Sequence, residues 1–434
     1  MPEVSKIIGV VEIPKEILEI SQKKITDVLS LKTKIESFLK EEITDLLNVV
    51  LAGAINLDSS DIHIEPQEKN AKIRIRLDGT LQDVTEFAKE TYQTLVSRIK
   101  LLSGIKLNVS DRPQDGRFSV SLGTLSVEIR VSTLPSEYGE SIVFRILNPK
   151  SLISLEELGM RADLLAILEK EIRKPNGMII VTGPTGSGKT TTIYAFLKKV
   201  QKPEIKIITV EDPIEYRLRG ISQTQVDPKK GYDFAAGLKS VMRQDPDVIL
   251  VGEIRDMETV TTALQAALTG HLVFTTLHTN DASGTVARLQ SLGEKTANIA
   301  PALNMVIAQR LARKTCEKCV KLEKAPDPVL KKIKNGLRNL PRNIKIPKIQ
   351  KGLKIPQAKG CKSCNLTGYR GRIGIFELLL VDDEIEKTIL SSPSMLTLKE
   401  KAVKRGMTTM YQDGIIKVLE GKTTIDEIEK ITGE

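Results

Sequence analysis

The spacing of apolar residues changes along the chain, and these changes mark the expected domains. From residue 40 to 148, helical stretches alternate with segments in which every second residue is apolar, the pattern of half-buried strands. The expected helices are 45–56 and 92–102, and the expected strands are 61–66, 72–77, 126–131 and 141–147. Asp78-Gly79 is a turn signal after the second strand. We therefore predict a small α+β domain over residues 40–148.

Beyond an expected linker at 149–160, the apolar residues form continuous runs of strand length, with helical stretches between them. The runs are MIIV (178–181), IKIITV (205–210), DVILV (247–251) and HLVFTTL (271–277). Such runs are typical of parallel strands covered on both faces. They predict an α/β core over 161–315, followed by a cysteine-bearing element at 316–368 and a helical region at 369–434. Residues 1–39 are expected to form a short N-terminal segment, polar and helical in part.

Composition narrows the class of protein. The longest apolar stretch, Leu46–Leu57, is too short to cross a bilayer, and acidic residues near the N-terminus exclude an apolar leader, so we expect a cytoplasmic protein. Only 3% of the 434 residues are aromatic, which argues against a platform that stacks bases or sugars. The net charge is +10, and much of it lies in an insert at 321–360 with twelve basic and two acidic residues. A solvated surface excursion fits this insert, and the net charge also fits contact with nucleic acid, an anionic membrane surface or an acidic partner.

A phosphate-binding loop stands between the first run of the core and the helix after it. The sequence GPTGSGKT at 183–190 fits G-x-x-x-x-G-K-[ST], with a strand before and a helix after. Glycines let backbone N–H groups curl around a phosphate, and the helix N-terminus adds partial positive charge. We expect Lys189 to reach the β- and γ-phosphates and the Thr190 hydroxyl to face Mg²⁺. The nucleotide-binding residues are Gly183, Pro184, Thr185, Gly186, Ser187, Gly188, Lys189, Thr190 and Thr191.

Three strand ends deliver polar side chains to the same edge. Glu211, Glu253 and His278 each follow an apolar run, and in an open α/β sheet ligands bind beyond the carboxyl ends of the strands. Hydrolysis of a terminal phosphate needs Mg²⁺ and a residue that orients water, and the two glutamates are the candidates. Gly252 stands where an aspartate commonly ends such a strand, so Glu253 is expected to act as an outer acceptor for the metal.

The four cysteines form two C-x₂-C pairs. CEKC (316–319) and CKSC (361–364) can each supply two thiolates to one tetrahedral Zn²⁺. Four cysteine ligands leave no open coordination position, so the expected metal is structural. A redox pair or unbridged thiols are the alternatives.

Together these residues resemble the type II secretion and type IV pilus assembly ATPase family. The resemblance rests on GPTGSGKT, ITVEDPIEY (208–216), DPDVILVGEIRD (245–256) and TGHLVFTTLHTN (269–280), and upstream on SSDIHIEP, RPQDGR and IRVSTLPSEYGE. It implies a RecA-like P-loop core, a preceding PAS-like domain and a tetracysteine element of the assembly type. It also implies a hexameric motor that hydrolyses ATP and works, by domain closure, on a platform protein at the inner membrane.

The resemblance also implies roles for single residues. Glu211 would activate water, Glu253 would support the metal, and His271 and His278 would occupy a histidine box. Arg130 and Arg145, on the preceding domain, would reach the γ-phosphate. Two other classes stay open at this point. The first is a nucleic-acid translocase: the basic insert favours it, but the insert has no aromatic residue that could stack on bases. The second is a nucleotide-binding scaffold without turnover.

Overall fold

The computed structural model describes residues 9–433, and these fold into two compact units. The N-terminal unit runs to Ser151 and also takes in the segments 316–319 and 359–370. The second unit contains 152–315, 320–358 and the chain from Gly371 onward. Met1–Ile8, the stretch expected to lack an apolar leader, lies outside the described residues. No helix among the described residues is long and apolar enough to cross a membrane.

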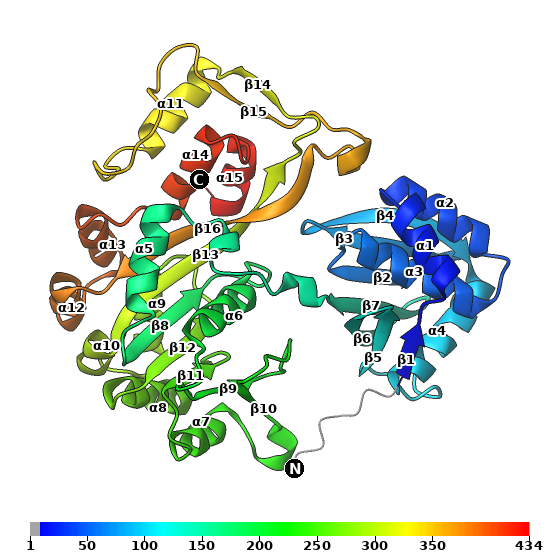
Figure 1. Ribbon diagram of the computed structural model, residues 1–434, viewed down its shortest axis with the longest axis horizontal. Helices are drawn as coiled ribbons and strands as arrows, with labels where there is room; N and C mark the ends of the chain where they lie inside the picture. The colour runs from blue at the N-terminus through cyan, green and yellow to red at the C-terminus, as the bar shows by residue number, and fades with distance from the viewer. Residues whose placement is uncertain (1–8, 434) are drawn as a thin grey trace. The chain divides into compact units, whose positions relative to one another are not determined.

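The N-terminal unit is built on one seven-stranded sheet with the order β1-β5-β6-β7-β2-β3-β4 (Figure 1). All neighbouring strands are antiparallel except β1 and β5, which are parallel. The strands are β1 (Gly9–Glu12), β2 (Asp61–Pro66), β3 (Asn70–Leu77), β4 (Thr80–Ala88), β5 (Gln114–Leu122), β6 (Leu125–Ser136) and β7 (Gly139–Leu147). The expected strands coincide with β2, β3, β6 and β7, and the turn at Asp78-Gly79 has positive φ at both residues.

Four helices bury the apolar face of this sheet: α1 (Lys15–Lys24), α2 (Val28–Phe38), α3 (Ile43–Asn56) and α4 (Lys89–Ser103). The helix α3 contacts the other three, and its residues from Leu46 to Ile55 are buried. The compact unit begins earlier than the expected boundary at residue 40. Val11, Ile17 and Leu31 are buried in its core, so β1, α1 and α2 belong to it. The sparse apolar positions of 1–39 gave only a weak helical signal.

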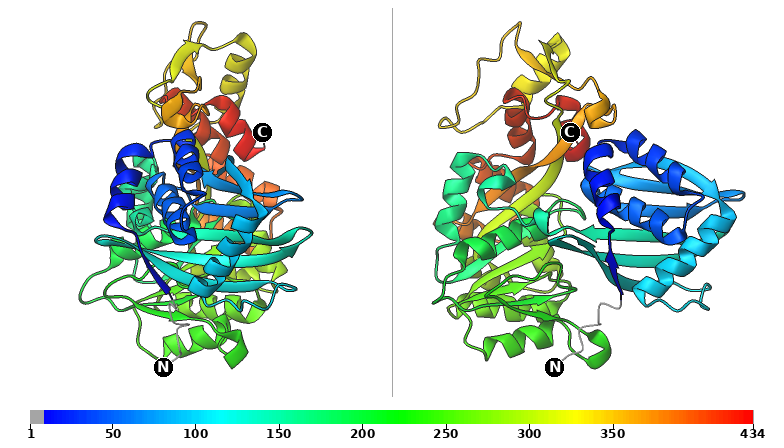
Figure 2. Two further views of the ribbon diagram at one scale, coloured as in Figure 1. Left: turned by 90° about the vertical axis from the view of Figure 1, so that its right-hand side faces the viewer. Right: turned by 45° about the vertical axis from the view of Figure 1, so that its right-hand side comes forward.

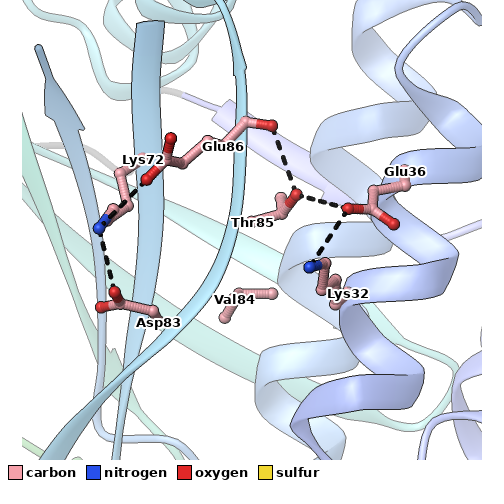
Figure 3. A pocket seen from close by; sticks show the side chains of 7 residues that line it. All are labelled: Lys32, Glu36, Lys72, Asp83, Val84, Thr85 and Glu86. Carbon is pink, nitrogen blue, oxygen red and sulfur yellow. Dashed lines mark hydrogen bonds and ion pairs between the residues drawn. The ribbon is translucent and has the colours of Figure 1, made fainter.

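A cavity of about 340 Å³ lies where α2 meets β3 and β4 (Figure 3). Lys72 donates to Asp83 at 3.0 Å and lies 3.2 Å from Glu86, and Thr85 donates to Glu36 at 3.1 Å. These side chains form hydrogen bonds and ion pairs with one another. The cavity is therefore lined by a surface ion-pair network and is not a ligand site.

The second unit is built on a seven-stranded sheet with the order β10-β9-β11-β12-β8-β13-β16. The pairs from β10 to β13 are all parallel, as the continuous apolar runs predicted. The strands are β8 (Gly177–Thr182), β9 (Ile207–Glu211), β10 (Ser222–Gln225), β11 (Val248–Val251), β12 (Leu272–Leu277), β13 (Leu303–Thr315) and β16 (Tyr369–Leu380).

Helices cover both faces of this sheet (Figure 2). Alternate residues of β8 enter different apolar clusters: Met178 and Ile180 pack with α7, α8 and α9, whereas Ile179 and Val181 pack with α5 and α6. The helices are α5 (Ala162–Glu171), α6 (Lys189–Val200), α7 (Phe234–Met242), α8 (Met257–Leu268), α9 (Ser283–Ser291) and α10 (Thr296–Ala302).

The C-terminal part contains more strand than expected. The region 369–434 was expected to be helical, yet it opens with the twelve-residue strand β16, buried from Ile373 to Leu379. The helices α12 (Asp383–Leu390), α13 (Met395–Lys404), α14 (Met410–Leu419) and α15 (Ile425–Thr432) follow. The basic insert forms the ribbon β14 (Lys321–Lys324) and β15 (Lys354–Gln357) with α11 (Asp327–Gly336), whose Leu330 and Ile333 are buried.

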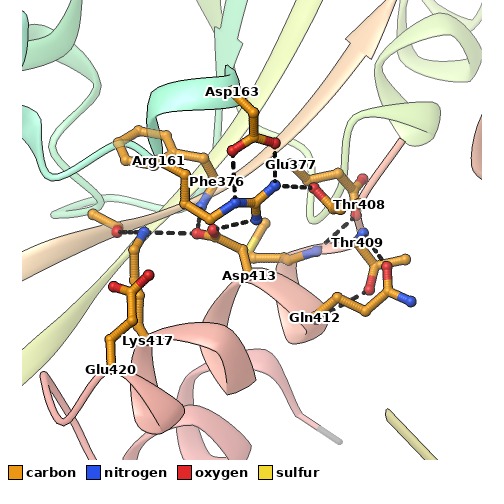
Figure 4. A network of polar contacts seen from close by, with 12 residues as sticks. Arg161, Asp163, Phe376, Glu377, Thr408, Thr409, Gln412, Asp413, Lys417 and Glu420 are labelled. Atoms are coloured by element: carbon orange, nitrogen blue, oxygen red, sulfur yellow. Dashed lines mark hydrogen bonds and ion pairs between the residues drawn. The ribbon is translucent and has the colours of Figure 1, made fainter. Parts of the chain in front are cut away.

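A buried ionic network fastens the start of α5 to α14 (Figure 4). The Arg161 guanidinium donates to Asp413 at 2.7 Å and to Asp163 at 2.8 Å. Asp413 also accepts from Lys417 at 2.7 Å and from the backbone N–H of Phe376 at 2.9 Å. Each buried charge therefore has an opposite charge or a backbone dipole beside it, which a group withdrawn from water requires.

Candidate functional site

The loop between β8 and α6 has the backbone conformation of a phosphate cradle. Gly183, Gly186 and Gly188 have φ of 151°, 79° and 88°, values that favour glycine. A Cβ at Gly183 would lie 2.4 Å from the Gln309 carbonyl, and one at Gly188 would lie 2.9 Å from the Gln309 side chain. The hydroxyl of Ser187 is buried without a partner among the described residues. The loop thus fits an anion that its backbone N–H groups and this hydroxyl would bind.

Lys189 lies over this loop as the first residue of α6. Its ammonium donates to the carbonyls of Gly183 at 2.8 Å and Pro184 at 3.2 Å. Burial lowers the pKa of Lys189, and the negative charge of Glu253 opposes this shift. A phosphate in the loop would supply the anion that such a partly buried ammonium lacks.

Glu253 follows β11 and lies near a guanidinium and an imidazole. It forms an ion pair with Arg255, and its carboxylate lies 3.9 Å from Nε2 of His278. The residue before it, Gly252, approaches β9 closely, since a Cβ there would lie 3.2 Å from the Val210 carbonyl. The close approach explains why a glycine stands at position 252, so that the carboxylate comes two residues after the end of β11.

The two histidines of the expected histidine box lie at opposite ends of β12. In the register with β8, Leu277 is opposite Thr182 and Leu272 is opposite Gly177. His278 therefore stands beside the phosphate loop, whereas His271 stands at the far edge of the sheet, about 20 Å away for a six-residue strand. There His271 bonds to the carbonyl of Ala266 at the end of α8. The structure brings only His278 to the loop.

The environment of His278 favours the neutral imidazole. Burial lowers its pKa below 6.5, the positive charge of Lys189 lowers it further, and Glu253 opposes both. Lys189, Glu253 and His278 are therefore electrostatically coupled at the carboxyl edge of the sheet.

Glu211, the last residue of β9, is only 4% exposed. Its carboxylate accepts hydrogen bonds from the Tyr194 hydroxyl, from Thr209 at 2.5 Å and from the Gln223 amide at 3.1 Å. A carboxylate with three donors is stable in the interior, but in this conformation it is closed to water. The expected role of Glu211 as a water-activating base remains a prediction.

Sequence reasoning did not single out Tyr194 or Gln309. Gln309 lies on β13, buried below the phosphate loop, and accepts from the Thr192 hydroxyl at 2.7 Å. No motif marks either position, because each acts through a contact between elements far apart in the chain.

Three arginines of the N-terminal unit lie side by side on its sheet. Arg130 on β6 is directly opposite Arg145 on β7, and Arg117 on β5 is directly opposite Arg130. Arg145 lies 3.4 Å from Asp61, while Arg130 and Arg117 each lie 3.8 Å from Glu128. This row of three guanidiniums, of which Arg117 was not expected, suits a multiply charged anion.

The four cysteines converge as predicted. The Sγ atoms of Cys316, Cys319, Cys361 and Cys364 all lie within 4.8 Å of one another. Cys316 and Cys361 are 3.9 Å apart, and Cys319 and Cys364 are 3.8 Å apart. Sulfurs about 2.3 Å from a tetrahedral Zn²⁺ stand about 3.8 Å from one another. The geometry and the thiol donors therefore fit one zinc ion.

Within the N-terminal unit, the second cysteine segment contacts α2. The backbone N–H of Val28, at the start of α2, donates to the Asn365 side chain at 2.7 Å. Asn365 follows Cys364, whose thiol accepts backbone N–H groups of Cys361 at 3.1 Å and Gly368 at 3.3 Å. Burial acts to raise the pKa of Cys364, yet these N–H groups favour the thiolate and bring the value to about 7.

Comparison with known proteins identifies the family. The model of the family described as "Type II/IV secretion system protein" matches residues 38–430. The chain belongs to the type II/IV secretion system protein family. It is 42% identical to the type II secretion system protein E of Aeromonas hydrophila over 90% of this chain and 76% of that protein. It is 43% identical to the type IV pilus assembly ATPase PilB of Thermus thermophilus over 87% of this chain, but spans only 42% of that relative's length.

Solved structures of similar fold agree with this family. The pilus retraction motor PilT with bound ADP is 26% identical, with a TM-score of 0.59 over 89% of this chain and 96% of that one. The Legionella pneumophila ATPase DotB, at 22% identity, has a TM-score of 0.64 over 89% of this chain and 95% of that one and supports the fold alone. The predicted resemblance and the predicted α/β fold class, with a RecA-like core and a tetracysteine element, are confirmed.

Proposed function

We propose that this chain is an ATP-hydrolysing motor of type IV pilus assembly or type II secretion. The observation that carries the proposal is the convergence of Lys189, Glu253 and His278 on a glycine cradle at the carboxyl edge of a parallel sheet. Lys189 suits the phosphates, and Glu253 suits the water or metal ion that would lie beside them. The family of the chain agrees with an ATPase.

In this proposal the loop 183–191 binds the phosphates of ATP. Backbone N–H groups of the loop surround the β-phosphate, and Lys189 exchanges the carbonyls of Gly183 and Pro184 for phosphate oxygens. Thr190 would hold Mg²⁺, with Glu253 as an outer acceptor, and the metal would neutralise phosphate charge.

The two glutamates differ in what they offer the reaction. Glu253 shares its surroundings with Lys189 and His278 and is 17% exposed at its side chain, so it can contact the water layer around the terminal phosphate. Glu211 is only 4% exposed, so its carboxylate must become open to water before it can take a proton from it. We therefore assign the carboxylate nearest the phosphate to Glu253. Glu211 keeps its proposed role as the base that activates water, and this role depends on the conformation of β9. His271 is assigned a structural role at the end of α8.

Arg130 and Arg145 would complete the site when the two units close on ATP. Charge grows on the equatorial oxygens of a terminal phosphoryl group during transfer, and a guanidinium there accelerates the reaction by about 10³-fold or more. The row on β6 and β7 presents two such groups side by side. Hydrolysis and release would then reopen the units, and this motion would be the work of the motor.

The remaining proposals concern partners and place. Six copies would form a ring acting on a platform protein at the inner membrane, with the chain cytoplasmic and attached through its partners. One Zn²⁺ would stabilise the cysteine element. DNA uptake is the second candidate, and the basic insert favours it, although α11 anchors that insert in the core. Stimulation of turnover by DNA that disappears at higher salt would support this alternative.

The proposal is tested by phosphate release from ATP with the purified full chain. Lys189→Ala should abolish turnover and weaken ATP binding, because the phosphates lose their principal cation. Lys198→Ala, on the same helix and exposed, is the matched control and should turn over as the wild type does. A wild-type chain that releases no phosphate in any assembly state, or a Lys189→Ala chain that matches it, would contradict the proposal.

A further inference from the structure

Both carboxylate oxygens of Glu211 accept hydrogen bonds. Thr209, two residues earlier on β9, and Gln223 on β10 both donate to Oε1, at 2.5 and 3.1 Å. The Tyr194 hydroxyl donates to Oε2 from α6. Because different donors hold the two oxygens, the plane of the carboxylate is fixed rather than free to rotate.

Tyr194 joins this carboxylate to the phosphate loop. It lies in the second turn of α6, the helix that begins at Lys189. Any shift of α6 on phosphate binding moves the Tyr194 hydroxyl and with it one oxygen of Glu211. The register of β9 with β11 places Glu211 beside Gly252, one residue before Glu253.

The hydroxyl of Tyr194 stays protonated and so remains a hydrogen-bond donor. Burial raises the pKa of Tyr194 far above its usual value, and the nearby Glu211 charge raises it further. The ring is fixed by an edge contact with Tyr216, at a centroid distance of 6.1 Å. A phenylalanine would keep this ring packing and lose the hydrogen bonds of the hydroxyl, one to Glu211 and one with the backbone of Tyr216.

We propose that Tyr194, together with Thr209, is a positioning residue that sets the orientation of Glu211 and couples it to the P-loop helix. The inference rests on the proposed ATPase function and concerns how the orientation of Glu211, at the end of β9, changes when phosphate binds. Tyr194 does not touch the nucleotide. Its effect should therefore appear in the turnover step and not in nucleotide affinity.

The test is steady-state ATP turnover of full-length Tyr194→Phe and Thr209→Val, each made also in a Glu211→Gln background. Each single variant should lower kcat about tenfold, the effect of about 1.4 kcal/mol on the barrier, and should leave KM for ATP and the Kd for ADP within about threefold of wild type. In the Glu211→Gln background neither substitution should lower kcat further. Such non-additivity is expected only when both residues act through the same carboxylate.

Tyr232→Phe is the matched control, since its hydroxyl contacts Thr224 on β10 at 2.9 Å and not Glu211. It should keep the wild-type kcat. Two results would overturn the inference: a kcat within twofold of wild type in both single variants, or equal losses with and without Glu211. If Tyr194→Phe fails to fold, Thr209→Val decides by the same criteria. A wild-type chain without turnover would instead reject the proposed ATPase function.

Discussion

At the scale of single residues, local motifs predicted the phosphate loop but not the state of each side chain. GPTGSGKT specified Gly183, Gly188 and Lys189, because a fixed spacing is enough to form the cradle. The burial of Glu211 depends on hydrogen-bond donors from α6 and β10. The residues next to Glu211 in the sequence do not predict these donors. His271 and His278 look equivalent in sequence, yet they lie at opposite ends of one strand.

The pKa of His278 is a direct test of the predicted electrostatics. We expect it to titrate below 6.5, because burial and Lys189 disfavour the imidazolium more than Glu253 favours it. Between the folded midpoint and 6.5 the unfolded chain binds the extra proton, so this residue's contribution to stability rises with pH across that window. NMR titration can resolve the three histidines of the chain, with His278→Gln for assignment.

Removal of the neighbouring charge should change that titration. Lys189→Ala should raise the midpoint of His278, since the ammonium is one of the causes of the lowered pKa, whereas Lys198→Ala should leave it unchanged. A midpoint at or above 6.5 in the wild type would show that Glu253 outweighs burial.

At the scale of elements, periodicity found the strands whose pattern is simple and missed those whose burial is mixed. The strand β8 is buried throughout and carries the continuous apolar run 178–181, and β3 alternates strictly, so both were predicted. The strand β13 carries Arg310 and Arg313 among buried residues, and β16 opens with YRGR, so neither fits one period. Both are stabilised by pairing with strands distant in sequence, which local pattern does not report.

The cysteine element should depend on zinc. We expect one zinc per chain in protein purified under reducing conditions, measured by elemental mass spectrometry. Cys364→Ser should release it and expose the segments 316–319 and 359–370 to hydrogen exchange, because structural zinc supplies folding free energy directly. Ser363→Ala, in the same knuckle, should keep the metal. Metal-free wild-type protein with a Cys316–Cys319 disulfide would contradict the assignment.

At the scale of the whole molecule, the residues proposed for the reaction are divided between two units. The phosphate loop, Glu253 and His278 belong to the second unit, and the row of Arg117, Arg130 and Arg145 belongs to the N-terminal one. The sequence predicted both sheets from their separate patterns. The proposed closure on ATP would involve both units, so the pattern of either unit alone does not predict it.

The central claim is that ATP hydrolysis needs both units, and phosphate release by an Arg130→Ala/Arg145→Ala double variant tests it most directly. We predict normal folding, ADP affinity within about threefold of wild type, and turnover lower by at least about 100-fold, as expected when a guanidinium no longer neutralises the transferring phosphoryl group. Arg74→Ala, on the same sheet and held by Glu65 and Asp83, is the control for lost surface charge. Turnover of the double variant within about threefold of wild type, a difference of only ~0.65 kcal/mol, would contradict the account.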